Sequence, residues 1–107
     1  MGIEKKGVGE ITLYTLPYCK HCTELKIELS SRDIPYKSIN VDEHVLIGDW
    51  VEDNLKTDTY PVIHIEKSPE NYLYLLSSTD LETLDNVRIF NTIDEALKIL
   101  LQYYYEI

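Results

Sequence analysis

The chain has 107 residues, 44% of them hydrophobic, which is enough for one domain with a modest core and too few for two ordinary ones. Its net charge of −9 is uneven, because residues 1–40 carry six Lys/Arg and five Asp/Glu whereas residues 41–107 carry four and fourteen. Such an acidic surface repels nucleic-acid backbones and anionic lipids, so we expect neither as a partner. No run reaches the roughly 18 apolar residues of a membrane span, and the N-terminus lacks the apolar stretch of a signal peptide. We therefore expect a single domain over residues 1–107 in the cytoplasm.

The first elements predicted are a strand followed by a helix. Residues 10–15 (EITLYT) alternate in polarity and are rich in β-branched and aromatic residues, a pattern typical of a strand. Pro17 ends this strand, and an apolar stripe at helical spacing predicts a helix from Lys20 until the sequence SSRDIP breaks it at Ser30 to Pro35.

A second strand and a second helix follow. Residues 36–42 (YKSINVD) predict the strand, and residues 43–56 predict the helix. We expect this helix to bury the side chains of Val45, Leu46, Trp50, Val51 and Leu55.

The second half of the chain predicts a hairpin and further helices. Residues 60–67 and 70–78 are predicted to be antiparallel strands joined by a turn. Two pairs of residues match the capping-box spacing, Thr79 with Glu82 and Thr92 with Glu95, and each pair predicts the start of a helix. The second of these helices is the last of the chain and runs through residues 95–105. The order β-α-β-α-β-β-α-α predicts an α/β domain with a four-stranded mixed sheet and helices on both faces.

Both cysteines of the chain lie in the motif Cys-Lys-His-Cys, at the turn from the first strand to the first helix. At a helix N-terminus, unpaired N–H groups and the helix dipole stabilise a thiolate and lower the pKa of Cys19 from about 8.5. Lys20 and, when protonated, His21 add positive charge. Cys22 lies about one turn further on and can attack a mixed disulfide formed at Cys19. Cys19 is therefore the candidate nucleophile and Cys22 the candidate resolving thiol.

Two other roles for the cysteines, a structural disulfide and a zinc site, have weaker support in the sequence. A disulfide that closes so small a loop restricts the unfolded chain very little, and a reducing cytosol disfavours structural disulfides. A closed zinc site needs four ligands, but the histidines His21, His44 and His64 are not paired at a ligand spacing. We expect no metal.

The β-α-β opening, the Cys-x-x-Cys turn and the Thr-Tyr-Pro at residues 59–61 make the chain resemble the glutaredoxins, which have the thioredoxin-like fold. The resemblance extends from about Ile11 to Leu101. It implies dithiol-disulfide oxidoreductase activity with glutathione as co-substrate, in a monomer that acts on disulfide-containing proteins, with ribonucleotide reductase as a family-typical partner.

The resemblance also implies a substrate or glutathione site. Pro61 would follow a cis peptide bond, and Tyr60 would offer its backbone N–H and C=O to the bound substrate. The remaining residues implied for this site are Tyr18, Thr59, Thr79 and Asp80, the last two at the γ-glutamyl end of glutathione, where N–H groups at a helix start would meet its carboxylate.

The chain departs from the family pattern at three places. Leu16 replaces a lysine that faces the glycine carboxylate of glutathione in many members, and Lys-His replaces the usual Pro-Tyr between the cysteines. Leu76-Ser77 or Ser77-Ser78 replaces the Gly-Gly that follows the fourth strand in the family. Two alternatives therefore stay open, namely a thioredoxin-type electron donor that is independent of glutathione and a non-catalytic thioredoxin-like binding module, for example one holding an iron–sulfur cluster.

Overall fold

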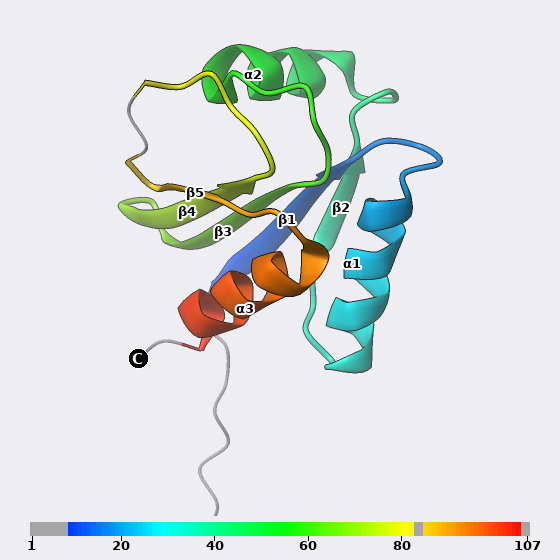
Figure 1. Cartoon of the computed structure of the whole chain (residues 1–107), viewed down its shortest axis with the longest axis vertical. Helices are drawn as coiled ribbons and strands as arrows, with labels where there is room; N and C mark the ends of the chain where they lie inside the picture. Colours follow the sequence, from blue (N-terminus) through cyan, green and yellow to red (C-terminus); the bar gives the residue numbers. More distant parts are fainter. Residues whose placement is uncertain (1–8, 83–84, 106–107) are drawn as a thin grey trace, which may run out of the picture.

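The computed structural model describes residues 9–82 and 85–105. The elements alternate between strands and helices in the first half of the chain (Figure 1). In chain order they are β1 (Glu10–Thr15), α1 (Lys20–Ser31), β2 (Lys37–Asn40), α2 (Val45–Leu55), β3 (Val62–Ser68), β4 (Asn71–Leu76), β5 (Val87–Ile89) and α3 (Ile93–Tyr104).

The strands form one mixed sheet in the order β2-β1-β3-β4-β5. β1 pairs parallel with β2 and antiparallel with β3, β3 pairs antiparallel with β4, and β4 pairs parallel with β5. The expected thioredoxin-like α/β fold is confirmed. The sheet has five strands where four were expected, because the short strand β5 adds to the edge next to β4.

The helices cover the sheet from both sides, with α2 on one face and α1 and α3 on the other (Figure 1). The alternation of the strands sorts their side chains between these two layers. Ile11 and Leu13 of β1 and Ile63 and Ile65 of β3 are buried in a core cluster with α1 and α3. A second cluster on the α2 side contains Cys22, Val41, Val51, Leu55, Tyr60, Val62, Leu76 and Val87. The sequence thus positions Cys22 and Tyr60 in the same buried layer.

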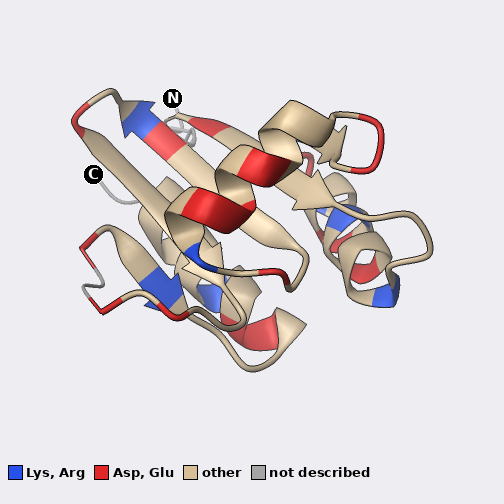
Figure 2. Ribbon diagram, turned by 90° about the horizontal axis from the view of Figure 1, so that it is seen from above, with Lys and Arg blue, Asp and Glu red and all other residues tan. Residues whose placement is uncertain are grey.

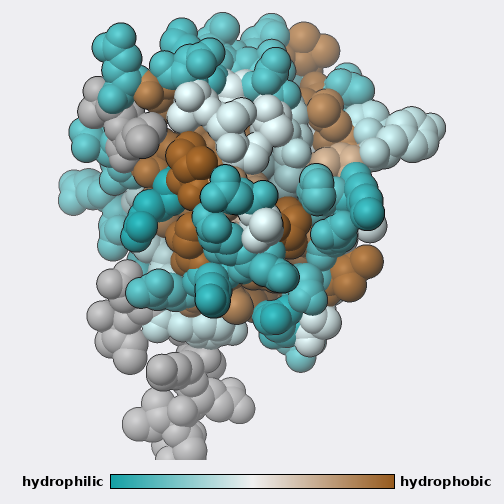
Figure 3. Space-filling view, viewed as in Figure 1, coloured by the Kyte–Doolittle hydropathy of each residue, from teal (hydrophilic) through white to brown (hydrophobic). Residues whose placement is uncertain are grey.

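The expected buried face of α2 is only partly correct. Val51 and Leu55 are buried, but Val45, Leu46 and Trp50 are exposed by 63%, 85% and 45%. In Figure 3, hydrophobic groups at the upper right lie over the N-terminal end of α2 as Figure 1 shows it. Gly48 is buried instead, because its lack of a side chain lets the helix approach Val41 closely.

The structure also corrects the expectation of a helix that starts at Thr79. Residues 79–82 form no helix, residues 83–84 lie outside the described part of the chain, and β5 begins at Val87. The Thr79 hydroxyl donates a hydrogen bond to the backbone oxygen of Leu55 and accepts one from the Leu81 N–H at 3.1 Å. The residue therefore ties the segment to the end of α2 instead of capping a helix. The second capping box is confirmed, since Thr92 is the N-cap of α3 and accepts from the Glu95 N–H at 3.1 Å.

None of the helices in the described ranges is long and apolar enough to cross a membrane.

Candidate active site

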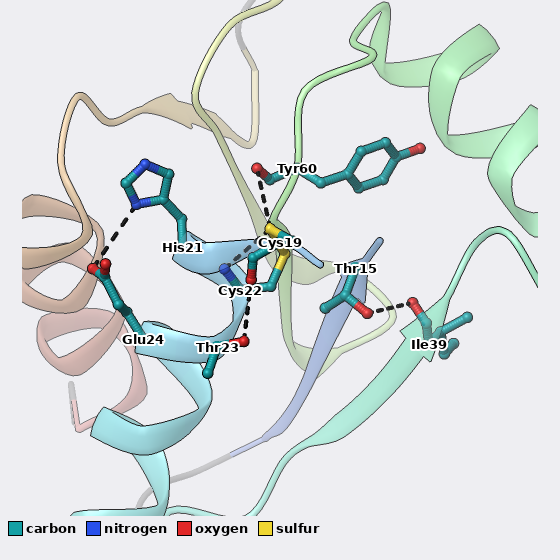
Figure 4. Close-up of a disulfide and its surroundings, with 8 residues drawn as sticks. All are labelled: Thr15, Cys19, His21, Cys22, Thr23, Glu24, Ile39 and Tyr60. Atoms are coloured by element: carbon teal, nitrogen blue, oxygen red, sulfur yellow. Dashed lines mark hydrogen bonds and ion pairs between the residues drawn. A yellow bond between two sulfur atoms is a disulfide. The ribbon is translucent and has the colours of Figure 1, made fainter. Parts of the chain in front are cut away.

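Cys19 and Cys22 form a disulfide at the start of α1, with their Cα atoms 5.2 Å apart (Figure 4). The two sulfurs differ in accessibility, because Cys19 is partly exposed whereas Cys22 is 2% exposed and belongs to the α2-side core cluster. An incoming thiol or disulfide can therefore reach Cys19 far more easily than Cys22.

Cys19 is the N-cap of α1. Its backbone is extended (φ −90°, ψ 107°), its sulfur accepts a hydrogen bond from the Cys22 N–H at 3.1 Å, and its carbonyl accepts one from the Thr23 N–H at 3.1 Å. A cysteine sulfur thus takes the position in which Ser, Thr or Asp usually caps a helix. The Cys22 N–H that bonds the disulfide sulfur is positioned to stabilise a thiolate on Cys19 once the disulfide is reduced.

Tyr60 and Pro61 lie directly against the disulfide. The Tyr60–Pro61 peptide bond is cis, and the Tyr60 carbonyl oxygen lies 4.0 Å from the Cys19 sulfur (Figure 4). In the disulfide this is a contact only, because the sulfur has no proton to donate. The backbone just before Pro61 is therefore adjacent to the more accessible sulfur.

The Tyr60 side chain points away from the disulfide toward α2. Its hydroxyl donates a hydrogen bond to the Glu52 carboxylate at 3.1 Å. Burial raises the pKa of this tyrosine well above its usual value of 10.0, and Glu52, Asp58 and Asp42 raise it further because their negative charges oppose ionisation. Glu52 is thus bonded to the Tyr60 hydroxyl, and the charges of Asp58 and Asp42 add to its effect. Sequence reasoning missed Glu52, since a lone glutamate on a helix gives no signal of a contact eight residues away.

The residues flanking the cysteines are exposed. Tyr18 has a left-handed backbone (φ 59°) and a fully exposed side chain, on a loop between β1 and α1 that projects from the body of the molecule in Figure 1. Lys20 is exposed as well. His21 lies 3.9 Å from the Glu24 carboxylate across one turn of α1, a separation that gives at most a weak, solvent-screened ion pair. Leu16 packs partly buried on the α2-side cluster.

A hollow beside the disulfide gathers residues from four segments. It is lined by His21, Thr59, Tyr60, Pro61, Ser77, Phe90, Asn91, Thr92 and Ile93. The Ser77 hydroxyl is buried without a hydrogen-bond partner among the described residues, and the Thr59 and Ser78 hydroxyls are hydrogen-bonded at 3.1 Å. The N-terminal end of α3 was not expected here, although the capping box at Thr92 indicated that a helix begins at that point.

Thr79 and Asp80, the residues expected to bind the γ-glutamyl group, do not present the free N–H groups of a helix start. The Asp80 N–H donates to the Lys56 carbonyl at 3.0 Å, and the Thr79 hydroxyl is held by Leu55. The Asp80 side chain is exposed. Thr79 and Asp80 are therefore fixed to the end of α2, and the carboxylate of Asp80 is the group of this pair that faces solvent.

No group of three or more His, Cys, Asp or Glu residues within 9–82 and 85–105 is placed to hold a metal ion.

A thioredoxin-like sheet with a Cys-x-x-Cys pair at the start of its first helix defines the class of thiol–disulfide oxidoreductases. A family model described as Glutaredoxin matches residues 11–68, which is more than half of the chain, and the chain belongs to this family. The matched region contains both cysteines, Tyr60 and Pro61, and it ends before Ser77, Thr79 and Asp80. No curated protein matches the chain.

Proposed function

We propose that the protein is a dithiol–disulfide oxidoreductase in which Cys19 is the nucleophile and Cys22 the resolving thiol. The observation that carries this assignment is the difference between the two sulfurs, since Cys19 is partly exposed at the helix N-cap and Cys22 is buried. The helix N-terminus favours the thiolate form of Cys19, which is the reactive form.

The reaction transfers two electrons to the substrate disulfide. The Cys19 thiolate attacks one substrate sulfur, a new S–S bond forms, and the second substrate sulfur leaves as a thiolate that takes a proton from water. The Cys22 thiolate then attacks the Cys19 sulfur of the mixed disulfide and releases the first substrate thiol. The product is the Cys19–Cys22 disulfide, and two thiols of glutathione reduce it again.

The residues around the cysteines have supporting roles in this proposal. Lys20 and, when protonated, His21 stabilise the thiolate electrostatically. The Tyr60 backbone, adjacent to Pro61, aligns the substrate chain by backbone hydrogen bonds, while Tyr18 and Thr59 line its path. At the far end, the exposed Asp80 carboxylate beside Thr79 pairs with the ammonium of a γ-glutamyl group.

Glutathione is the proposed co-substrate, and disulfide-containing proteins, ribonucleotide reductase among the family-typical ones, are the proposed partners. We further propose that residues 1–107 act as one monomeric domain in the cytoplasm.

The test is steady-state reduction of a glutathione mixed disulfide, with NADPH and glutathione reductase as the recycling system. Turnover should disappear in Cys19→Ser. Cys22→Ser should keep monothiol deglutathionylation and lose the reduction of protein disulfides. Turnover in Cys19→Ser, or full reduction of protein disulfides by Cys22→Ser, would contradict the assigned roles.

A second candidate is an electron donor recycled by a thioredoxin-type reductase. It is favoured by Leu16, which packs on the core where many family members have a glutathione-binding lysine, and by the Asp80 N–H, which is already bonded to Lys56. Reduction of the Cys19–Cys22 disulfide by NADPH and a thioredoxin reductase, but not by glutathione, would establish this candidate in place of the first.

A further inference from the structure

The face of the sheet that α2 covers continues beyond this helix. Side chains of paired residues on neighbouring strands point to the same face, so the pairing sorts them into rows, and the row beneath α2 contains the buried Val62 and Leu76. Two further rows lie toward the start of β1, each with one residue from β1, β3 and β4: Thr12, His64 and Tyr74, then Glu10, Glu66 and Tyr72. Figure 2, which views the molecule from the α2 side, shows the strands extending past α2 at the end where the β3–β4 hairpin turns.

Aromatic side chains from α2, β3 and β4 form a continuous ledge on this part of the sheet. The rings of His64 and Tyr74 are stacked with their centroids 4.3 Å apart, and Tyr72 meets Tyr74 edge-on at 5.8 Å. Trp50 of α2 lies 6.3 Å from the Tyr74 ring. All four side chains keep contact with solvent, and Trp50 is 45% exposed. The aromatic ledge therefore presents ring surface that the described elements leave partly open.

An apolar groove adjoins the aromatic ledge at Trp50. Its volume is about 390 Å³, and it is lined by Tyr14, Ile39, Leu46, Ile47 and Trp50. Leu46 is 85% exposed, and its neighbour Val45 is 63% exposed. Adjoining exposed apolar side chains are typical of interaction surfaces. The groove and the aromatic ledge thus form one surface that runs along β1.

Glu10 and Glu66 make the far end of this surface negative. They lie directly opposite each other on β1 and β3, an arrangement in which like charges destabilise a sheet. The ion pairs in the described part of the chain both lie within α1, so neither carboxylate is neutralised by one. In the described strands, the one Lys or Arg in these two rows is Lys37, which is paired with Thr12. Two carboxylates therefore face one ammonium group, and a ligand that brings a cation to Glu10 and Glu66 relieves their repulsion.

The distance between the groove and the carboxylate pair defines the partner. Tyr14 lines the groove and Glu10 lies four residues earlier on β1, which separates the two rows by about 13 Å. An extended polypeptide spans this distance in four residues, and its residues i, i+2 and i+4 point to one side. The first would fill the groove, the second would pack on the aromatic ledge, and the third would place a cation between the carboxylates and the Tyr72 ring.

We propose that this surface binds an extended segment of a partner polypeptide that has an apolar residue in the groove and, four residues away, an Arg or Lys at Glu10 and Glu66. The carboxylate pair lies at the end of β1 opposite to Cys19. The surface is a docking site that holds a partner without using the cysteines, so the inference does not depend on the proposed thiol chemistry.

The experiment titrates the isotopically labelled, oxidised protein with capped pentapeptides and follows its amide chemical shifts by NMR. The peptides are Leu-Thr-Val-Thr-Arg, Leu-Thr-Val-Thr-Glu and Ser-Thr-Val-Thr-Arg. We expect the first to bind about ten-fold more tightly than either of the others, since each of these lacks one of the two anchors. The shifts should change at residues 10–14, 46–50, 64–66 and 72–74. Equal affinity for the three peptides, or changes confined to residues 19–22 and 59–61, would overturn the inference.

Two pairs of matched variants test the two anchors. Glu10→Gln/Glu66→Gln should lose most of the preference for Arg over Glu, whereas Asp33→Asn/Asp94→Asn should keep it, because these exposed residues adjoin α1 and α3 on the other side of the sheet. Leu46→Ala should weaken binding of the Leu-Thr-Val-Thr-Arg peptide several-fold, and Ile27→Ala, which removes an exposed apolar side chain of α1, should not. Equal effects within either pair would overturn the inference, since they would reflect only total charge or total exposed apolar area.

A second copy of the chain is the competing occupant of this surface. Sedimentation at the protein concentration of the titration distinguishes the two. A monomer that binds the Leu-Thr-Val-Thr-Arg peptide supports the docking of a partner. A dimer that Leu46→Ala converts to a monomer would overturn it, because the surface would then be covered by the chain itself.

Discussion

Tyr60 connects two elements at the active site, because its carbonyl lies next to Cys19 and its hydroxyl is bonded to Glu52 of α2. We predict that Tyr60→Phe lowers the free energy of unfolding by about 1 kcal/mol, the usual net contribution of an intramolecular hydrogen bond. Urea unfolding measures the change. Tyr18→Phe is the control and should leave stability unaltered, since Tyr18 is fully exposed; equal losses in both variants would argue against a role for the bond.

His64 on β3 stacks on Tyr74 of β4, with ring centroids 4.3 Å apart. Burial lowers the pKa of His64 from 6.5, against the smaller opposite effect of Glu66. The unfolded chain therefore takes up a proton near pH 6.5 while the folded chain does so only at lower pH, so this group destabilises the fold as pH falls below about 6.5.

We predict that His64→Gln reduces the loss of stability between about pH 8 and pH 5.5, although the lost stacking lowers stability at every pH. The measurement is the urea midpoint at several pH values. His44→Gln, an exposed residue at the N-terminus of α2, should retain the wild-type dependence. An unchanged slope in His64→Gln would show that other groups cause it.

At the scale of single elements, Gly9 permits β1 to approach β3. Its backbone has φ of +112°, and a Cβ atom there would lie 2.5 Å from the Glu66 carbonyl oxygen and 3.1 Å from the Lys67 Cα. We predict that Gly9→Ala costs at least about 1–2 kcal/mol from the backbone conformation alone. Glu10→Ala, at the exposed neighbouring position, should cost much less in the same urea unfolding experiment; a Gly9→Ala protein as stable as wild type would refute the close approach.

The second prediction at this scale concerns Thr92, the N-cap of α3. The Thr92 hydroxyl accepts from the Glu95 N–H, and Asp94 and Glu95 occupy the first turn, where they interact favourably with the helix dipole. Thr92→Ala should therefore lower the unfolding free energy by about 1 kcal/mol, and Thr92→Ser should restore most of it. If the serine variant were as unstable as the alanine variant, the hydroxyl would not be the stabilising group.

The elements differ in how well the sequence predicts them. Residues 10–15 and the helix after Cys19 are predicted within a residue, because alternation and a stripe at helical spacing are local signals. The prediction of a helix start at Thr79 is wrong because the Thr79 hydroxyl bonds to Leu55, 24 residues away at the end of α2, and local spacing does not indicate such a contact. The predicted burial of Trp50 is wrong because an apolar residue on a helix indicates burial without showing which side of the helix the sheet covers.

At the scale of the whole molecule, the sequence predicts the reactive part of the site more completely than the part that binds substrate. The cysteines and Pro61 follow from a motif and a spacing, whereas Tyr60 and the Glu52 carboxylate that its hydroxyl contacts become neighbours only through the fold. The excess of acidic residues after position 40 is visible in the sequence, but the contact of one of them, Glu52, with Tyr60 is not.

The most direct test of the central claim is to trap the mixed disulfide. Reduced Cys22→Ser is mixed with a neutral peptide disulfide, quenched with acid and mapped by mass spectrometry. The account predicts rapid accumulation of a peptide adduct on Cys19, at a rate at least about ten-fold higher than adduct formation on the buried Cys22 in Cys19→Ser. Equal rates at the two positions, or faster reaction at Cys22, would contradict Cys19 as the nucleophile.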